Sequence, residues 1–312
     1  MECNIETASQ KEFVKALSQH ELYVKSDHAM GEEVTFKGTT PNPDLILRHL
    51  RFYHMDMVGW DVHGRDLSGS AIIDCDISGA DFSDTLNNKT SYMYSRATKT
   101  DFTGVQGKET NFSHLAGDGA KFRRALLQQP DFSYSYGSNL SLTGSISEPT
   151  LDNVKFIGLN HDCPKEMLII EHGTARHASI KSSYIHGNID GLEAPYIDFS
   201  GSTLSGVCKG SNLRCGTLCG ADITKLAMPS NILLQTKTDY PIYQFGPIGR
   251  ENGMLAFNPV TQQVSVPGFA DAIPLKQFHS QHGFRGSALM RAFGEAMEKL
   301  PKVTQKKHTT SR

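Results

Sequence analysis

The sequence predicts a mainly β protein built as a solenoid of short repeats. Every fifth position from 47 to 142 gives twenty positions, and sixteen of them are apolar. The composition of the chain would give roughly eight. A period of five fits neither a helix nor a strand, so each unit must bury its apolar face against the next unit. Within this series, every tenth position from 82 to 142 holds an aromatic or large apolar residue: Phe82, Tyr92, Phe102, Phe112, Phe122, Phe132 and Leu142.

The residues around each central apolar position are also regular. A small residue usually stands two positions before it, as at Ala80, and Asp or Asn often stands directly before it, as at Asp81. Ser or Thr and then Gly often follow, as at Thr103 and Gly104. Because Asp and Asn bond to their own backbone and Gly tolerates a positive φ, we expect a corner of the chain within each unit.

The segments 80–84 (ADFSD) and 221–225 (ADITK) resemble the pentapeptide repeat family, whose pattern is A(D/N)Lxx. The resemblance covers about residues 46–158 and 177–228. It implies a right-handed quadrilateral β-helix, with one repeat on each side and four repeats in each coil. The sequence departs from the family at four central positions that normally hold Leu or Phe: Asn87, Gly107, Gly117 and Gly137.

This departure has a physical interpretation. With four sides per coil, residues twenty apart stack on one side and residues ten apart face each other, so Phe102 and Phe112 belong to opposing ladders. Two sides with large residues and two with small ones can fill the same interior as four medium ones, as close packing requires. A flatter, two-sided roll with ten residues per coil is the alternative architecture.

Composition limits the function classes. The 312 residues include 31 basic and 33 acidic ones, and the resulting net charge of −2 gives no indication of a polyelectrolyte partner. No apolar run reaches the ~18 residues of a membrane-spanning helix. The first residues lack the basic and apolar blocks of a secretion signal, and six scattered Cys indicate reduced thiols. We therefore expect the cytoplasm of a bacterial host cell, with a virion as the alternative.

Breaks in the five-residue frame divide the chain. We predict an N-terminal cap (1–45), a pentapeptide repeat β-helix (46–158), a projecting loop (159–176), a second repeat block (177–228), a C-terminal α+β module (229–300) and a disordered basic tail (301–312).

The cap begins with a capping-box pattern at Ser9–Glu12, which predicts a short helix, and candidate strands follow at 22–24 and 34–36. Trp60 stands where the repeat prefers a small residue, so we expect the strict coils to begin near Asp66.

The C-terminal module has strand-like and helix-like segments. Strands are expected at 232–234, 240–245, 254–257 and 264–266, and helices at 271–282 and 287–300. The module is similar to one that follows pentapeptide repeats in many bacteriophage and prophage proteins, with the approximate pattern hGxIGSR…GCFxGTLxEF…HG. Here Arg250-Glu251 replaces Ser-Arg and Pro267 replaces Cys. The residues that fit are Gly246, Ile248, Gly249, Gly268, Phe269, Phe278, His282 and Gly283.

The C-terminal module is also a candidate site of homo-oligomer formation. The second resemblance implies a phage or prophage origin. It implies no reaction.

The projecting loop is the candidate partner-binding site, since loops on rigid scaffolds often carry recognition. Its polar side chains could also supply metal ligands or an acid–base pair, although nothing in the sequence fixes their geometry. The candidate residues are His161, Asp162, Glu166, Glu171, His172, Arg176 and His177.

Other candidate chemistry is weak. Cys208, Cys215 and Cys219 lack the paired short spacings of a zinc site, and the segment 246–250 (GPIGR) lacks the spacing and Lys of a P-loop. No nucleophile elbow appears. We therefore assign no catalytic residue, cofactor or metal.

The favoured function is a non-catalytic scaffold of phage or prophage origin that binds a protein partner, for example a host factor. A virion component and an enzyme using the 159–176 loop or the C-terminal module are alternatives. A third is a DNA mimic that binds gyrase, as some members of the family do. From Asp61 to Lys155, however, twelve acids face nine bases. That balance is far from the one charge per ~1.7 Å of a DNA duplex, which argues against imitation of DNA, and the near-neutral net charge argues against a nucleic-acid partner.

Overall fold

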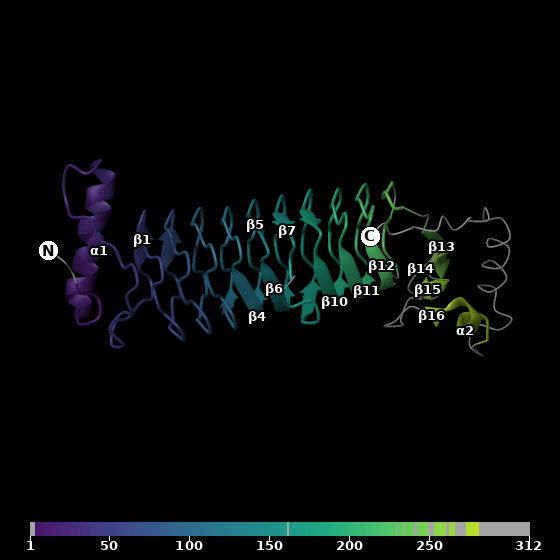
Figure 1. Cartoon of the computed structure of the whole chain (residues 1–312), viewed down its shortest axis with the longest axis horizontal. Coiled ribbons are helices and arrows are strands. Elements are labelled where there is room, and N and C mark those ends of the chain that lie inside the picture. The colour runs from purple at the N-terminus through teal and green to yellow at the C-terminus, as the bar shows by residue number, and fades with distance from the viewer. Residues whose placement is uncertain are drawn as a thin grey trace, which may run out of the picture.

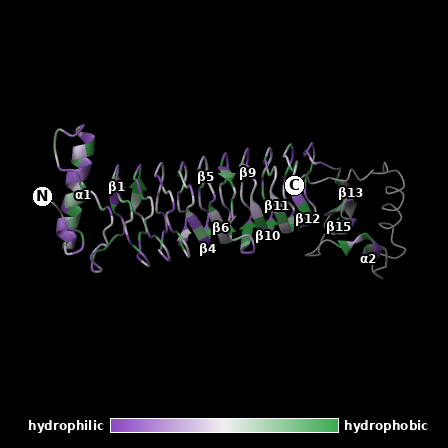
Figure 2. Cartoon of the chain, in the orientation of Figure 1, coloured by the Kyte–Doolittle hydropathy of each residue, from purple (hydrophilic) through white to green (hydrophobic). Residues whose placement is uncertain are grey.

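The computed structural model describes residues 4–160, 162–228, 230–233, 235–239, 242–248, 253–259, 262–265 and 273–280. The chain forms a rod in which a β-solenoid of about 9 coils lies between a helix at one end and a small sheet at the other (Figure 1). Hydrophilic and hydrophobic residues are interspersed along the solenoid (Figure 2), as expected where inward and outward positions alternate along each coil. The predicted fold class, a mainly β, right-handed quadrilateral β-helix, is confirmed.

Each coil has four sides, which we number by their buried central residues. In one coil the first side is centred on Tyr92, the second on Ala97, the third on Phe102 and the fourth on Gly107. Successive coils bond in parallel at a separation of twenty residues, as from Asp81 to Asp101. The two-sided roll is wrong, because its ten-residue coil would pair residues ten apart.

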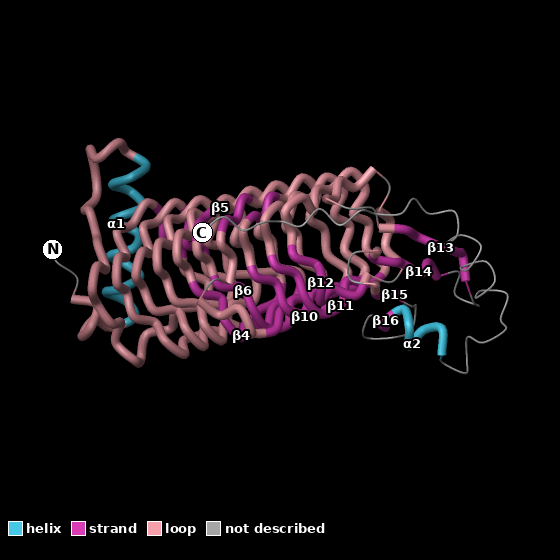
Figure 3. The backbone as a smooth tube through the Cα atoms, turned by 45° about the vertical axis from the view of Figure 1, so that its right-hand side comes forward, coloured by secondary structure: helices cyan, strands magenta, loops and turns pink. Residues whose placement is uncertain are grey.

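Longer runs of parallel pairing form three sheets along the rod (Figure 3). On the first side, β1 (Arg51–Tyr53) pairs with β2 (Ala71–Ile73). The second side carries β5 (Tyr136–Ser138), β7 (Lys155–Ile157) and β9 (Ser179–Lys181).

The largest sheet covers the fourth side, and its longer strands extend onto the third. Its strands are β3 (Gln106–Lys108), β4 (Lys121–Gln128), β6 (Ser141–Ser147), β8 (Met167–Glu171), β10 (Tyr184–Asp190), β11 (Thr203–Lys209) and β12 (Asp222–Ala227).

Two opposing ladders of rings fill the interior, as predicted. On the third side the ring centroids of Phe102 and Phe122 stack at 4.7 Å, and on the first side those of Phe112 and Phe132 stack at 4.9 Å. Rings from the two ladders meet edge to face, with Phe102 and Phe112 at 5.5 Å. Such offset and T-shaped contacts suit the ring quadrupole, and all of these rings are buried.

The central glycines of the second side are compensated from a neighbouring position. A Cβ added at Gly117 or Gly137 would lie 3.2 or 2.8 Å from Cδ1 of Leu140. Leu140 stands two residues before a central position, where the repeat usually holds a small residue, and it is buried. Its side chain therefore occupies the volume that a central Leu or Phe fills in a regular repeat.

The corners form as the flanking residues predicted. The carboxylate or amide Oδ1 of the residue before a central position accepts a hydrogen bond from the backbone N–H two residues later, an Asx turn. This bond, 2.8–3.1 Å long, recurs at Asp61, Asp66, Asp76, Asp81, Asp101, Asn111 and Asp131. The acids of the repeat thus hold the corners as well as carrying surface charge.

Beyond Leu142 several coils lose one residue, because strands β6, β10 and β11 run straight across the corner between the third and fourth sides. Each strand has a glycine with positive φ at that point: Gly144 (108°), Gly187 (151°) and Gly206 (99°). A Cβ there would lie 1.9–2.2 Å from a carbonyl oxygen of the preceding coil. Only glycine fits this shortened corner.

The N-terminal cap differs from the prediction in two ways. Helix α1 (Gln10–Lys25) has the expected capping box between Ser9 and Glu12, but it is longer than expected and includes the candidate strand at 22–24. The coils begin well before Asp66, since the N–H of Phe36 already bonds to the carbonyl of Asp56 (2.9 Å).

Trp60 does not break the repeat, because the first coils are packed by aromatic residues from outside it. Its ring stacks on Phe36 at 5.9 Å, and Phe13 of α1 packs on both Phe36 and Phe52 at 5.5 and 6.3 Å. Helix α1 thus covers the open end of the aromatic interior. Trp60, at a position that is normally small, packs among these rings.

The projecting loop predicted over 159–176 is wrong for its second half. Strand β8 pairs with β6 and β10, and Leu168 and Ile170 are buried in the core. Thr150 pairs with Thr174 at a separation of twenty-four residues, so this coil carries a short insertion, which we place at 159–166. The apolar residues of β8 favour a place in the wall over exposure to water.

The solenoid also continues past the predicted end at 228, since Asn212 pairs with Ile232 and Thr217 with Lys237. A four-stranded antiparallel sheet follows, with β13 (Tyr243–Ile248), β14 (Gly253–Asn258), β15 (Gln263–Ser265) and β16 (Ile273–Pro274), and then helix α2 (Leu275–Ser280). The predicted helix at 287–300 and the tail at 301–312 lie outside the described residues.

Candidate functional site

The first candidates, in the insertion, are bonded to the wall of the solenoid. The hydroxyl of Ser141 donates to both carboxylate oxygens of Asp162 at 2.8 and 2.9 Å. Glu166 accepts a hydrogen bond from Thr143 Oγ1 (3.0 Å) and forms an ion pair with Arg123. The insertion is therefore folded back on the third side. His161 lies outside the described residues.

The remaining candidates lie at two different corners. Glu171 ends β8, and His172 follows at a corner with φ of 51°. Arg176 pairs with Asp152 of the preceding coil at 3.2 Å, and His177 belongs to another corner. The six candidates that the structure describes therefore lie at several places on the solenoid and do not form one cluster.

His177 belongs to a row of corner residues, which we call the corner row: Tyr94, His114, Tyr134, Asn153, His177 and Tyr196. All have φ between 55° and 64°, so each side chain leaves the backbone in the same direction one coil above the last. The ring of His114 stacks on Tyr94 at 4.5 Å and on Tyr134 at 5.0 Å, and that of His177 stacks on Tyr196 at 4.8 Å. The row is a ridge of stacked, half-exposed rings.

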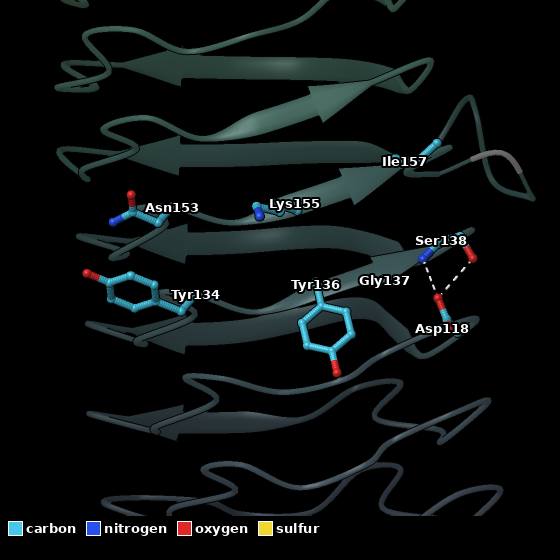
Figure 4. Close-up of a pocket in the computed structure, with 8 residues that line it drawn as sticks. All are labelled: Asp118, Tyr134, Tyr136, Gly137, Ser138, Asn153, Lys155 and Ile157. Carbon is cyan, nitrogen blue, oxygen red and sulfur yellow. Dashed lines mark hydrogen bonds between the residues drawn. The ribbon is translucent and has the colours of Figure 1, made fainter.

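Beside this ridge, the second side carries a shallow open depression of about 640 Å³ (Figure 4). Its lining includes Tyr134 and Ile157 at opposite ends, with Tyr136 of β5 between them. The side chains of Tyr134, Tyr136 and Ile157 are 54%, 53% and 56% exposed. Large apolar groups exposed together on rigid strands are typical of a binding surface. We call Tyr134, Tyr136, Ile157, Lys155 and Asp118 the second-side patch.

Charge in the patch is balanced. The carboxylate of Asp118 accepts hydrogen bonds from the backbone N–H and the hydroxyl of Ser138, at 2.7 and 2.9 Å (Figure 4). Lys155 stands one coil above Tyr136, because β5 and β7 pair these two residues. The patch thus offers one fixed anion and one cation around apolar rings.

Elsewhere on the rod, acids pair with bases one coil away. Arg96 lies 3.5 Å from Asp76, Lys121 lies 3.5 Å from Asp101, and further pairs involve Asp56, Asp66, Glu109, Asp152, Asp190 and Asp198. At Asp101 burial favours the protonated acid, but hydrogen bonds from Thr103 and the charge of Lys121 outweigh it and hold its pKa below the ordinary value. Each of these acids is therefore neutralised locally by a base of an adjoining coil.

The structure offers little for catalysis or metal binding. Within the described part of the chain, no three His, Cys, Asp or Glu side chains approach closely enough to hold a metal ion. Burial raises the pKa of the Cys75 thiol to about 12 and that of Cys208 to about 11, so neither is a nucleophile near neutral pH. The thiol of Cys215 donates to Oε1 of Gln235, one coil further along, at 3.2 Å. None of the described helices is long and apolar enough to cross a membrane.

The second-side patch was missed in the sequence, although a signal was present. In the five-residue frame, positions 134, 136 and 157 are flanking positions that point outward, and they hold Tyr, Tyr and Ile. Large apolar residues at outward positions of a solenoid are the signal that could have predicted this surface.

No family model and no curated protein matches this sequence. Among solved structures, HetL is similar: it is a pentapeptide repeat protein involved in heterocyst differentiation regulation from the cyanobacterium Nostoc sp. strain PCC 7120. It is 14% identical, with 61% of this chain and 87% of HetL covered and a TM-score of 0.38. Full-length QnrB1, a plasmid-mediated fluoroquinolone resistance protein, is 14% identical, with 66% of this chain and 92% of QnrB1 covered and a TM-score of 0.24.

Proposed function

We propose that this chain is a non-catalytic scaffold of phage or prophage origin that binds a protein partner, a factor of the host cell, through the second-side patch. The observation that carries the proposal is that Tyr134, Tyr136 and Ile157 are each more than half exposed, with Tyr134 at a corner and the other two on the paired strands β5 and β7. The proposed origin rests on the resemblance of the C-terminal module, most of whose matching residues lie outside the described part of the chain.

The chemistry of the patch suits a protein surface. Tyrosine is enriched among the residues that dominate binding energy, because it buries a large rigid area and keeps a hydrogen-bonding hydroxyl. The backbone of β5 and β7 is already fixed by neighbouring coils, so binding requires little further ordering. The depression is shallow and open, whereas small-molecule sites enclose most of their ligand.

The ion pairs between coils favour this function over imitation of DNA. A DNA mimic needs rows of acids that stay unneutralised, whereas Asp76 and Asp101 each face a base of the next coil. On the third side, Asp61, Asp81 and Asp84 have no ion pair within the described residues, but three acids fall far short of a duplex's charge density.

Site-specific photo-cross-linking tests the proposal. The photoreactive residue p-benzoylphenylalanine replaces Tyr136 in the full chain, which is expressed in a bacterial host and irradiated. A matched variant carries it at Thr217, which stands in the same outward row on the second side, four coils further along. We expect one defined protein adduct at position 136 and none at 217.

The added substitutions Tyr134→Ser and Ile157→Ser should abolish the adduct at 136 while the circular dichroism spectrum stays unchanged. Equal labelling at 136 and 217, or an adduct that survives both substitutions, would show that the patch is not the binding surface. A measured turnover lost in Tyr136→Ser would replace the scaffold by an enzyme.

A further inference from the structure

The fourth side carries a second regular surface feature, which we call the alternating row. Its residues point outward from successive coils and are joined by parallel pairing from each coil to the next. Polar and apolar side chains alternate strictly along it: Asp66, Leu86, Gln106, Leu126, Ser145, Ile169, Asn188 and Val207. Figure 3 shows the strands that carry most of this row lying side by side along the rod.

The apolar members face solvent to different degrees. Leu126 is 53% exposed and Leu86 is 37% exposed, while Ile169 and Val207 are half-buried. Coils of a parallel solenoid rise about 4.8 Å each, so one apolar side chain returns every ~9.6 Å over six coils, a length of about 29 Å. A long row of spaced apolar groups indicates a partner that repeats at the same distance.

Few partners have that repeat. An α-helix laid along the row presents equivalent residues every seven positions, or about 10.5 Å, and would be nearly 3 Å out of step by the last apolar residue. A β-strand returns to one face every ~6.8 Å and does not match. Another solenoid with the same rise stays in step throughout, and the simplest such partner is a second copy of this chain.

A neighbouring row on the same side gives independent support. It includes Lys108, Gln128, Ser147 and Glu171, which pair in order from coil to coil, and it continues to Asp190 and Lys209, which form an ion pair with each other at 3.5 Å. Neither Lys108 nor Glu171 has an ion pair within the described residues. If two copies lie antiparallel, with a two-fold axis across the rods between Gln128 and Ser147, Lys108 of each copy faces Glu171 of the other.

The same axis organises the alternating row. An in-plane axis perpendicular to the rods sets each row against its own copy, so Leu126 faces Ser145 and Ile169 faces Gln106. Leu86, Leu126 and Ile169 then each enter the space between two apolar side chains of the other copy, which closes the gaps in the row. The charges and the apolar spacing, which are separate observations, thus select one register.

We infer that the fourth side is the interface of an antiparallel homodimer, with its two-fold axis between the coils of Leu126 and Ser145. This surface is distinct from the second-side patch. Self-recognition through one face is the commonest form of closed assembly.

Sedimentation velocity of the full chain over a range of concentrations tests the inference. The unchanged protein should show a concentration-dependent dimer. Leu126→Glu should abolish it, because a charge would enter the apolar seam. Lys108→Glu and Glu171→Lys should each weaken dimerisation by about tenfold, because each variant sets like charges together at two symmetric places.

The double variant Lys108→Glu/Glu171→Lys should restore dimerisation, since only a two-fold contact between these residues is repaired by exchanging them. Tyr136→Glu, on the second side, is the matched control and should leave the dimer unchanged. All variants lie on the surface, and their thermal unfolding midpoints verify that they fold. A monomer at every concentration, a dimer untouched by Leu126→Glu, or no rescue by the double variant would overturn the inference.

Discussion

The phenol of Tyr92 donates a hydrogen bond of 2.6 Å to Oδ1 of Asn87, and both residues lie in the middle of the aromatic interior without solvent exposure. Asn87 in turn donates through Nδ2 to Thr85 Oγ1 at 2.8 Å. Asn87 is one of the central positions where the family places Leu or Phe. The departure is therefore explained by a tyrosine on the adjoining side, whose hydroxyl needs an acceptor once it is buried.

This pair predicts a coupled stability effect. Tyr92→Phe should lower the free energy of unfolding by about 1–3 kcal/mol, because Oδ1 of Asn87 loses its donor while it stays buried. Asn87→Leu alone should be at least as harmful, since it leaves the Tyr92 hydroxyl without a partner. The double variant should recover much of the loss, because an apolar pair leaves neither group unsatisfied. Urea unfolding of all four proteins measures the coupling, and simple additivity would contradict it.

A second prediction concerns alkaline pH. Burial, assisted by the charges of Asp74 and Asp76, raises the pKa of Cys75 to about 12, whereas an unfolded thiol titrates near pH ~8.5. Between these values the unfolded chain releases a proton that the folded chain keeps. Stability should therefore be complete below about pH 8 and fall as the pH rises, by up to about 1.4 kcal/mol per pH unit for each such thiol.

Cys75→Ser provides the matched variant for this test. In the next coil Ser95 occupies the equivalent position and donates to the carbonyl of Ile72 at 3.0 Å, as Cys75 does to that of Phe52 at 3.4 Å. The variant should fold normally and lose less stability between about pH 8 and about pH 11. Thermal unfolding midpoints across that range provide the measurement, and identical slopes for both proteins would exclude Cys75 as the cause.

Much of the interior could be predicted because the inward positions obey one period. The five-residue frame that includes Phe102 and Phe112 depends only on which positions point inward, and the same positions point inward in every coil. The same reasoning stopped at segment 159–176, since an insertion of a few residues moved Leu168 and Ile170 out of frame. A shift in register hides a strand from a fixed period even when its residues are apolar.

The outward surface was harder to predict. Tyr136 contributes to no periodic signal, because the neighbouring coils place Ala116 and Lys155 at the equivalent positions. Whether such residues gather into a patch depends on which sides and coils adjoin, and this is a property of the folded rod. The six polar candidates that the structure describes illustrate the converse: they are close in sequence, but the corners of the solenoid separate them.

The shortened corner predicts that substitutions at two glycines differ strongly in how much they lower the stability of the protein. A methyl group at Gly187 would lie 1.9 Å from the carbonyl oxygen of Leu168, whereas one at Gly79 meets nothing within 4 Å. Gly187→Ala should destabilise the protein by more than about 3 kcal/mol or prevent folding, because the neighbouring backbone cannot yield. Gly79→Asn should cost less than about 1 kcal/mol, since Asn tolerates its positive φ of 65°. Thermal unfolding of both variants gives the comparison, and similar losses would refute the role of the close approach.

Single-residue insertions test the boundaries of the insertion itself. One residue added after Gly104 should disrupt the fold, because it shifts Phe112 and every later central residue of the ladder out of register. One residue added after Pro164 should be tolerated, since the coil already departs there from the regular length. Insertion after Thr174 should resemble the first case, because Thr174 pairs with both Thr150 and Glu193. Soluble yield and the unfolding midpoint of the three variants measure the outcome. If insertion after Thr174 were as mild as that after Pro164, β8 and the corner after it would belong to a loop and not to the wall.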